Sequence, residues 1–310
     1  SKALPKFDLQ LVSAQTGLGL PKLQSQIDDM LSSTPARQDL GRPRLAVDRS
    51  FTVAGVGTVV TGTLIDGRLS VGEEVELIPS GRKYRIRGLQ SHRKKVKVAE
   101  PGRRLAVNLS GVSHYEIERG ELLTTPKWLQ PTSLTDVKLR LIPGAPRPLK
   151  HNARVTFHML TSETTARIRL LNTKQLEPGE TAWAQIHLAN PIPLVRGDLF
   201  IVRSAETTVG GGKVVDPYPR RHRPFATAVL ERLTTMDEGS LEEALLHYAD
   251  QWGPCELSTL CQKGNLSLTE VQPVMEQLIE SRRIHLLVGS IDQHNSIVYS
   301  DRTLQRIRNE

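Results

Sequence analysis

The first 38 residues carry the pattern of a single α/β unit. The run "FDLQLVSA", residues 7–14, predicts a buried strand. Residues 17–33, "GLGLPKLQSQIDDMLSS", predict a helix, because Leu23, Ile27 and Leu31 repeat at the i, i+4, i+8 spacing of one helical face. One such unit cannot bury a core alone. We therefore expect residues 1–38 to be the C-terminal end of a larger α/β domain, followed by a linker.

The next 181 positions, 39–219, show short apolar runs that alternate with turn residues. In residues 39–128 the runs are "LAVDRSFTV", "TVVTGTL", "EVELI", "YRIRGLQS" and "RLAVNLSG". A second block, residues 129–219, includes "TDVKLRLI", "RVTFHML" and "TAWAQIHL". Many short strands with frequent turns are typical of closed barrels or sandwiches, so we expect two β-barrels.

Helical periodicity dominates residues 220–310. Three helices are predicted by "FATAVLERLTTM", "SLEEALLHYADQW" and "LTEVQPVMEQLIESRR". Two β-rich runs follow in "RIHLLVGSIDQHNSIVYS", and "DRTLQRIRNE" predicts the start of another helix. Three helices followed by a hairpin are the element order of a winged helix-turn-helix. The expected fold class is thus mainly β with α.

A charged pair interrupts the first strand of the first β block. Leu45, Val47 and Arg49 alternate, so a regular strand would place Arg49 on the apolar face. A guanidinium there is costly unless it meets an anion or reaches water. Two interpretations follow: an anion-binding pocket, or a structural arginine at the barrel rim that pairs with Asp48. Gly62, on the following strand, permits a close backbone approach or a bulge.

Charge favours an acidic partner. The net charge is +8 and the pI is about 9.6, which is typical of proteins that bind nucleic acid or acidic surfaces. Residues 82–97 contain no acidic side chain, and aromatic residues make up only 4% of the chain. We expect contact with a duplex backbone rather than base stacking, unless this is only a solvated barrel face. The candidate contacts are Arg82, Lys83, Arg85, Arg93, Lys94 and Lys95. The basic run "PYPRRHRP", residues 217–224, raises the same two interpretations.

Several classes of site are not expected. We find no paired catalytic carboxylates, nucleophile triad, histidine cluster or metal motif, so no catalytic or metal-binding residue is predicted. "GGGK", residues 210–213, lacks the spacing and the Ser/Thr of a P-loop. Two cysteines in 310 residues favour a reducing compartment, and no run approaches a membrane span. We expect a cytoplasmic protein, and the missing initiator methionine suggests an excised fragment.

Three motifs resemble translational GTPases. "LVSAQTGLGLPKL" resembles their last guanine-recognition element, in which a Ser-Ala pair, here Ser13 and Ala14, contacts the base. "FTVAGVGTVVTGTL" is similar to the second-domain signature of elongation factor Tu and its relatives. "IPLVRGDLFIVRSAETTVGGGKVVDP" resembles the closing strands of their third domain. The three motifs follow the family's order and span roughly residues 9 to 217.

Within that group, two features resemble the selenocysteine-specific elongation factors. One is the helical segment after the second barrel, and the other is "AVDRSFTV" together with "GRRLAVNL". The resemblance implies that Asp48, Arg49 and Arg104 line an aminoacyl pocket. A selenol is more acidic than a thiol or a hydroxyl, so selenocysteine is largely an anion at neutral pH, whereas serine is neutral. Desolvated arginines would hold the selenolate and would be left unpaired by serine.

The resemblance also implies partners and cofactors. The partners would be selenocysteinyl-tRNA, the ribosome, and the selenocysteine-insertion hairpin of messenger RNA through C-terminal domains mostly absent from this chain. The full-length protein would bind GTP and Mg²⁺ and hydrolyse GTP. This chain lacks a P-loop, so we expect it to be non-catalytic alone and to hold no cofactor. Two alternatives stay open: a fragment of a general elongation or initiation GTPase, and a winged-helix nucleic-acid-binding regulator with β-barrel domains.

Overall fold

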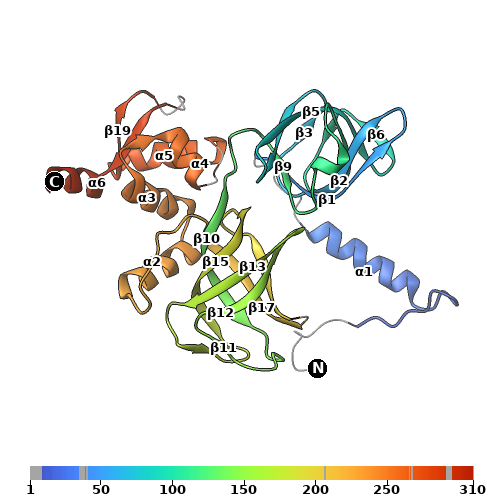
Figure 1. Cartoon of the computed structure of the whole chain (residues 1–310), viewed down its shortest axis with the longest axis horizontal. Coiled ribbons are helices and arrows are strands. Elements are labelled where there is room, and N and C mark those ends of the chain that lie inside the picture. The colour runs from blue at the N-terminus through green and yellow to red at the C-terminus, as the bar shows by residue number, and fades with distance from the viewer. Residues whose placement is uncertain are drawn as a thin grey trace. The chain divides into compact units, whose positions relative to one another are not determined.

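The computed structural model describes residues 9–34, 39, 41–205, 207–264, 266, 268–290 and 295–309. The chain divides into two units, Ser1–Gln38 and Asp39–Glu310. Strands account for most of the regular secondary structure of the second unit, and they form two closed barrels (Figure 1). The expectation of a mainly β fold with two barrels is confirmed.

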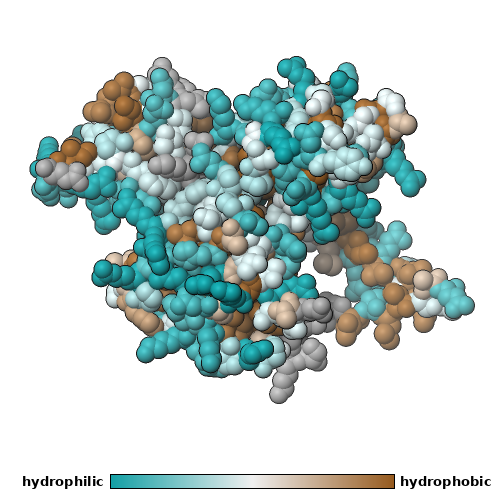
Figure 2. All heavy atoms as spheres, in the orientation of Figure 1, coloured by the Kyte–Doolittle hydropathy of each residue, from teal (hydrophilic) through white to brown (hydrophobic). Residues whose placement is uncertain are grey.

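The first unit contains the helix α1 (Leu20–Ser33), as predicted. A left-handed Gly19 precedes this helix and Pro21 lies in its first turn, where a missing N–H costs nothing. None of its residues is buried, and its apolar side chains form a brown strip in Figure 2. The strand predicted for residues 7–14 is wrong over its described part: residues 9–14 form no strand. The physical reason is that a strand needs a neighbour for its backbone groups, and no other strand occurs among the described residues of this unit.

Barrel 1 closes through six strands in the order β4-β9-β1-β2-β8-β5, with β5 pairing back onto β4. The six strands are β1 (Arg44–Val53), β2 (Gly57–Leu64), β4 (Glu74–Ile78), β5 (Arg82–Ser91), β8 (Arg104–Leu109) and β9 (Leu122–Thr124). The accessory elements are β3 (Leu69–Ser70), β6 (Lys94–Val96), β7 (Val98–Ala99) and the short helix η1 (His114–Glu116). Alternate residues such as Leu45, Val60 and Val107 point inward and are fully buried. They form the core that supports the outer face.

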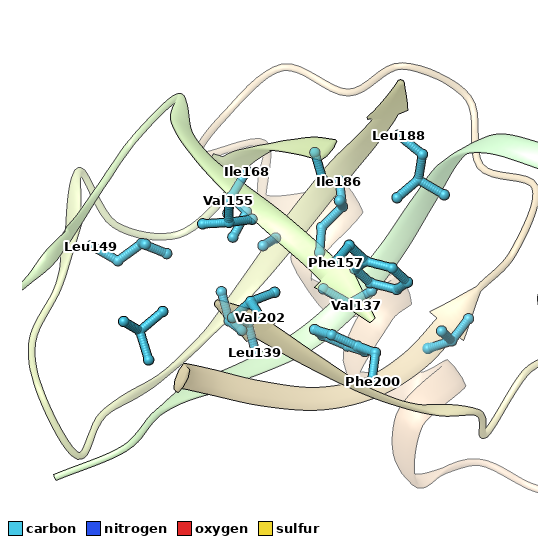
Figure 3. Packing of buried hydrophobic residues seen from close by; sticks show 14 of the residues in the cluster. Val137, Leu139, Leu149, Val155, Phe157, Ile168, Ile186, Leu188, Phe200 and Val202 are labelled. Atoms are coloured by element: carbon cyan, nitrogen blue, oxygen red, sulfur yellow. The ribbon is translucent and has the colours of Figure 1, made fainter. Parts of the chain in front are cut away.

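Barrel 2 closes in the order β10-β15-β13-β12-β16-β17. Its strands are β10 (Pro131–Leu141), β12 (Ala153–Met159), β13 (Ser162–Leu170), β15 (Thr181–Pro193), β16 (Leu199–Ser204) and β17 (Thr207–Asp216). A separate ribbon pairs β11 (Leu149–Lys150) with β14 (Gln175–Leu176). Phe157 and Phe200 stack at 4.9 Å among aliphatic side chains in the core (Figure 3). "GGGK" lies in β17, so it belongs to a strand, as the sequence indicated.

Four helices, a small sheet and a final helix follow barrel 2. They are α2 (Thr227–Glu238), α3 (Leu241–Trp252), β18 (Cys255–Glu256), α4 (Leu257–Gly264), α5 (Leu268–Glu280), β19 (Ile284–Val288), β20 (Ile297–Ser300) and α6 (Asp301–Asn309). We call residues 227–309 the C-terminal module. Its core also includes Leu171, Trp183 and Val215 of barrel 2. Classification of this module as a winged helix-turn-helix, and the domain limits at 38, 128 and 219, stay predictions.

Cys255 and Cys261 form no disulfide in the structure. Within the part of the chain that the structure describes, we find no helix with the length and apolar character needed to cross a membrane.

Candidate functional site

A β-bulge in β1 places the charged pair on the outer face of barrel 1. Val47 pairs with Gly62 and Arg49 pairs with Thr61, so Asp48 is an extra residue between them. The bulge reverses the inward and outward alternation of the strand. Arg49 is therefore exposed, and the expectation that it shares the apolar face of a regular strand is wrong. A Cβ at Gly62 would lie 2.1 Å from the carbonyl oxygen of Ala46, so only glycine fits opposite the bulge.

Arg104, at the start of β8, pairs with Asp48 through both of its terminal nitrogens. Nη1 donates to Oδ2 of Asp48, and Nη2 donates to Oδ1 at 3.1 Å. The hydroxyl of Thr61 also donates to Oδ1, at 2.7 Å. Partial burial works against ionisation of Asp48. The hydrogen bonds from Arg104 and Thr61, and the charges of Arg104 and Arg49, outweigh it, so the pKa of Asp48 lies below its ordinary value.

Arg49 adds a second guanidinium beside this pair. Among the residues that the structure describes, its side chain has no ion pair and no hydrogen bond. Asp48 carries one negative charge and the two arginines carry two positive charges, so the cluster has a net charge of +1. The side chain of Arg104 is 59% exposed and that of Asp48 is 22% exposed, so a ligand can reach both from solvent. The cluster suits a ligand with one negative charge.

A row of side chains crosses the outer face of barrel 1 from this cluster. The register places Arg49, Thr61, Ala106, Gln90 and Lys95 opposite one another on five neighbouring strands. Directly opposite residues share one face of a sheet, and five strands span about 19 Å at about 4.8 Å per step. Lys95 therefore shares its face with Arg49, a relationship that spacing along the chain does not show.

An apolar groove of about 470 Å³ lies beside that row. Phe51, Val53 and Val59 form part of its lining, and the polar groups of Gln90 and Asn108 reach it. Asn108 donates from Nδ2 to the carbonyl oxygens of the residues at 56 and 58, at 3.0 Å each. These bonds hold the turn between β1 and β2 against β8. A flat apolar group with hydrogen-bonding edges fits such a groove.

The six predicted backbone-contact residues are all exposed on barrel 1, but they differ in their partners. Arg82 donates to the backbone carbonyl of Glu116 at 3.0 Å and pairs with its carboxylate at 3.3 Å. Lys83 lies 3.8 Å from the carboxylate of Glu74. The remaining four have no ion pair among the described residues. These four are Arg85, Arg93, Lys94 and Lys95.

Ser13 and Ala14 lie in the turn before α1, in the first unit. The hydroxyl oxygen of Ser13 accepts a hydrogen bond from the backbone N–H of Thr16 at 3.2 Å, and Ala14 is exposed. The serine side chain is therefore used locally to shape this turn.

Sequence reasoning missed a basic surface on barrel 2. Arg154, Arg167 and His187 stand opposite one another on β12, β13 and β15. Burial is the main reason that the pKa of His187 lies below its ordinary value, and the charges of Arg169, Arg221 and Arg167 add to the effect. None of the four arginines has an ion pair among the described residues. Arg221 belongs to the basic run at residues 217–224, but the other three, at positions 154, 167 and 169, lie outside any basic run of the sequence. We call these four arginines and His187 the barrel 2 basic patch.

No group of three or more histidine, cysteine, aspartate or glutamate side chains suited to a metal occurs in the described ranges.

Two family models match the chain. Residues 136–221 match the beta-barrel domain of selenocysteine-specific elongation factors, and residues 57–124 match domain 2 of elongation factor Tu. A selenocysteine-specific elongation factor from Desulfomicrobium baculatum is 41% identical over 285 residues, which cover 90% of this chain and 43% of that protein. Another, from Haemophilus influenzae, is 31% identical over 217 residues, which cover 69% of this chain and 34% of that protein. The chain thus spans less than half the length of either relative.

Proposed function

We propose that this chain, which belongs to the family of selenocysteine-specific elongation factors, binds selenocysteinyl-tRNA for delivery to the ribosome. The observation that carries the proposal is the exposed cluster of Asp48, Arg49 and Arg104 on barrel 1. Its net positive charge suits a selenolate, which arginines would hold by charge-assisted hydrogen bonds. Seryl-tRNA brings no such anion. The neutral serine hydroxyl would displace water from the same guanidinium groups without supplying a negative charge, which is unfavourable.

The apolar groove would hold the last nucleotide of the tRNA. The amino acid is esterified to the ribose of that nucleotide, so its base must lie beside the pocket that holds the side chain. The groove lies beside the Arg49 row and offers an apolar floor with the amides of Gln90 and Asn108 at its edges. That combination favours a stacked base with polar edges.

The basic side chains would hold the duplex part of the tRNA. On barrel 1 these are Arg85, Arg93, Lys94 and Lys95, which have no internal ion pair among the described residues, with Arg82 and Lys83 contributing less. The barrel 2 basic patch offers a second surface of the same charge. Aromatic residues make up only 4% of the chain, so contact with phosphates rather than bases is favoured.

The activity of the whole protein is part of the same proposal. The longer protein would bind GTP and Mg²⁺, with Ser13 and Ala14 contributing to guanine recognition. GTP would order the surfaces that clamp the tRNA, and hydrolysis on the ribosome would release it. The messenger RNA hairpin would bind C-terminal to the segment described here. The C-terminal module would act as a winged-helix spacer, and this chain alone would not hydrolyse GTP.

The test compares Arg104→Ala with the matched control Arg68→Ala in the GTP-bound longer protein. Arg68 is similarly exposed, at 55%, and is also paired with a carboxylate, that of Glu100 at 2.8 Å. Arg104→Ala should weaken selenocysteinyl-tRNA binding about 10- to 100-fold more than seryl-tRNA binding, the range expected for a charged hydrogen bond. Arg68→Ala should change both affinities equally. Equal losses in Arg104→Ala would refute charge recognition and favour a general translational GTPase.

A further inference from the structure

We infer that Asp48 is an internal counter-ion, and that cargo binding exchanges the Asp48–Arg104 ion pair for two ion pairs with the aminoacyl group. One of these would join Arg104 to the selenolate, and the other would join Asp48 to the α-ammonium group. The inference rests on the proposed function and assigns Asp48 a role within the same site. The supporting observations are the pairing geometry and the hydrogen bond from Thr61.

The pairing geometry shows that the Nη1/Nη2 fork of Arg104 is already occupied. Both terminal nitrogens of its guanidinium donate to the two oxygens of Asp48. This fork of two parallel N–H groups is the one that binds a carboxylate or a similar anion most strongly. An incoming anion that needs the same fork must displace Asp48. Asp48 therefore occupies the place on Arg104 that an incoming anion would take.

The charges of the cargo complete the exchange. A selenocysteinyl ester carries a selenolate and, below the pKa of its amino group, an ammonium. The ammonium can pair with the displaced Asp48 while the selenolate pairs with Arg104. Each charge that loses a partner then gains another, and Arg49 remains as a second donor to the anion. One internal ion pair becomes two intermolecular ones.

This arrangement rejects cargo that carries only one of the two charges. A seryl group brings an ammonium but no anion, so it can take Asp48 only by leaving Arg104 unpaired. A simple anion has the opposite defect, since it takes Arg104 and leaves Asp48 without its main partner. Unpaired charges in a partly desolvated site are costly, so both incomplete exchanges are disfavoured.

Thr61 and the bulge keep Asp48 in position during the exchange. The hydroxyl of Thr61 donates to Oδ1 at 2.7 Å, and this bond does not depend on Arg104. Gly62 permits the bulge that turns Asp48 outward. Thr61 is therefore a positioning residue: it touches Asp48 rather than the cargo.

The experiment removes one charge from the protein and one charge from the ligand, and it uses the GTP-bound longer protein. The proteins are the wild type, Asp48→Asn and the control Glu100→Gln, another partly exposed carboxylate that accepts a hydrogen bond from an arginine. The ligands are selenocysteinyl-tRNA and its α-hydroxyacyl counterpart, in which a hydroxyl replaces the ammonium, both measured at pH 6.5. Loss of the ammonium should weaken binding to the wild type and to Glu100→Gln about 10- to 100-fold. In Asp48→Asn the same change should weaken binding less than about 3-fold.

The ion-pair exchange also predicts a second result from the same affinity measurements. Asp48→Asn should bind the α-hydroxyacyl ligand more tightly than the wild type does, because Arg104 no longer has an internal anion. An equal ammonium effect in the wild type and in Asp48→Asn overturns the exchange, and so does weaker binding of the α-hydroxyacyl ligand by Asp48→Asn. If the wild type shows no preference for selenocysteinyl- over seryl-tRNA, or binds neither, the proposed function itself fails.

Thr61 variants separate positioning from folding. Thr61→Val should reduce the ammonium effect, and Thr61→Ser, which keeps the hydroxyl, should restore it. A purely structural role would instead change the affinities for both ligands by the same factor in Thr61→Val. Circular dichroism and a denaturant midpoint close to that of the wild type are required of each variant before its affinities are compared.

Discussion

Arg44 of barrel 1 donates from Nη1 to both carboxylate oxygens of Asp198 in barrel 2, at 2.9 Å each. Its Nε donates to Asp66 at 2.8 Å, and its side chain is only 4% exposed. Burial is the largest influence on Asp198 and sets its pKa above the ordinary value, although Arg44 acts in the opposite direction. The two barrels are thus joined by a buried ion pair whose partners depend on each other.

Arg44→Met should lower the free energy of unfolding by about 3–5 kcal/mol, because it leaves a buried carboxylate without its counter-ion. The double variant Arg44→Met/Asp198→Leu should recover part of that loss, since the most deeply buried carboxylate is gone while Asp66, the more exposed partner of Arg44, keeps its charge. Urea unfolding monitored by circular dichroism measures both values. A double variant no more stable than Arg44→Met would contradict the pairing.

Gly62→Ala should disturb the bulge that presents Asp48. The new Cβ would lie 2.1 Å from a backbone oxygen, which cannot move without shifting β1. We expect a loss of about 1–3 kcal/mol in stability and a weakened Asp48–Arg104 pair. The measurement combines denaturant unfolding with the side-chain ¹⁵N resonance of Arg104. Gly144→Ala, where a Cβ meets nothing within 4 Å, is the control and should leave both unchanged.

The salt dependence of tRNA binding should separate the basic residues of barrel 1. Arg85→Ala should lower the slope of log affinity against log salt by about one unit, because Arg85 is available to a phosphate. Arg82→Ala should change that slope much less, because Arg82 is already paired with Glu116. Binding measured at four salt concentrations gives the slopes. Equal slope changes for the two variants would show that the internal pairing does not matter.

Two groups near the start of the C-terminal module, the buried Asp216 and the half-buried His247, should give opposite pH trends. Burial, followed by the charge of Asp136, raises the pKa of Asp216 to about 6. This raised pKa adds stability below about pH 4 that is lost as the pH rises through about 6. Burial, followed by the charge of Arg232, lowers the pKa of His247 to about 4. That group adds stability above about pH 6.5 that is lost as the pH falls through about 4.

In the wild type, these trends should largely cancel between about pH 4 and 6. Asp216→Asn should expose the histidine trend, so that stability rises with pH across this window more steeply than in the wild type. His247→Gln should expose the aspartate trend, with stability falling as the pH rises. Each difference from the wild type is limited to about 1.4 kcal/mol per pH unit. Denaturant midpoints at five pH values test both signs, and slopes of the same sign would exclude this assignment.

The helices and strands could be predicted from local sequence patterns. The geometry of the candidate site could not, because it depends on residues of neighbouring strands. The helix α1 and the strands of both barrels follow from apolar periods of 3.6 and 2. Leu45, Val47 and Arg49 alternate as a regular strand would, yet the bulge lies between the last two because Gly62 faces it across the sheet. Likewise Arg154 and His187 are distant in the sequence and meet only through β13.

The strand predicted for residues 7–14 shows that a local pattern can also predict an element that does not form. Its apolar alternation is real, but Leu9 and Leu11 are 91% and 85% exposed in the structure. A pattern can favour a strand without supplying a partner, and no neighbouring strand occurs among the described residues of the first unit.

The core shared by barrel 2 and the C-terminal module limits how domains can be exchanged between related proteins. Leu171, Trp183 and Val215 belong to barrel 2 by chain position, but they pack in the core of the helices that follow. A chimera joined at residue 219 would pack the helices of one relative against Leu171, Trp183 and Val215, which are shaped to fit the helices of this chain. Such a graft should keep its stability only if these three positions are transplanted together with the helices.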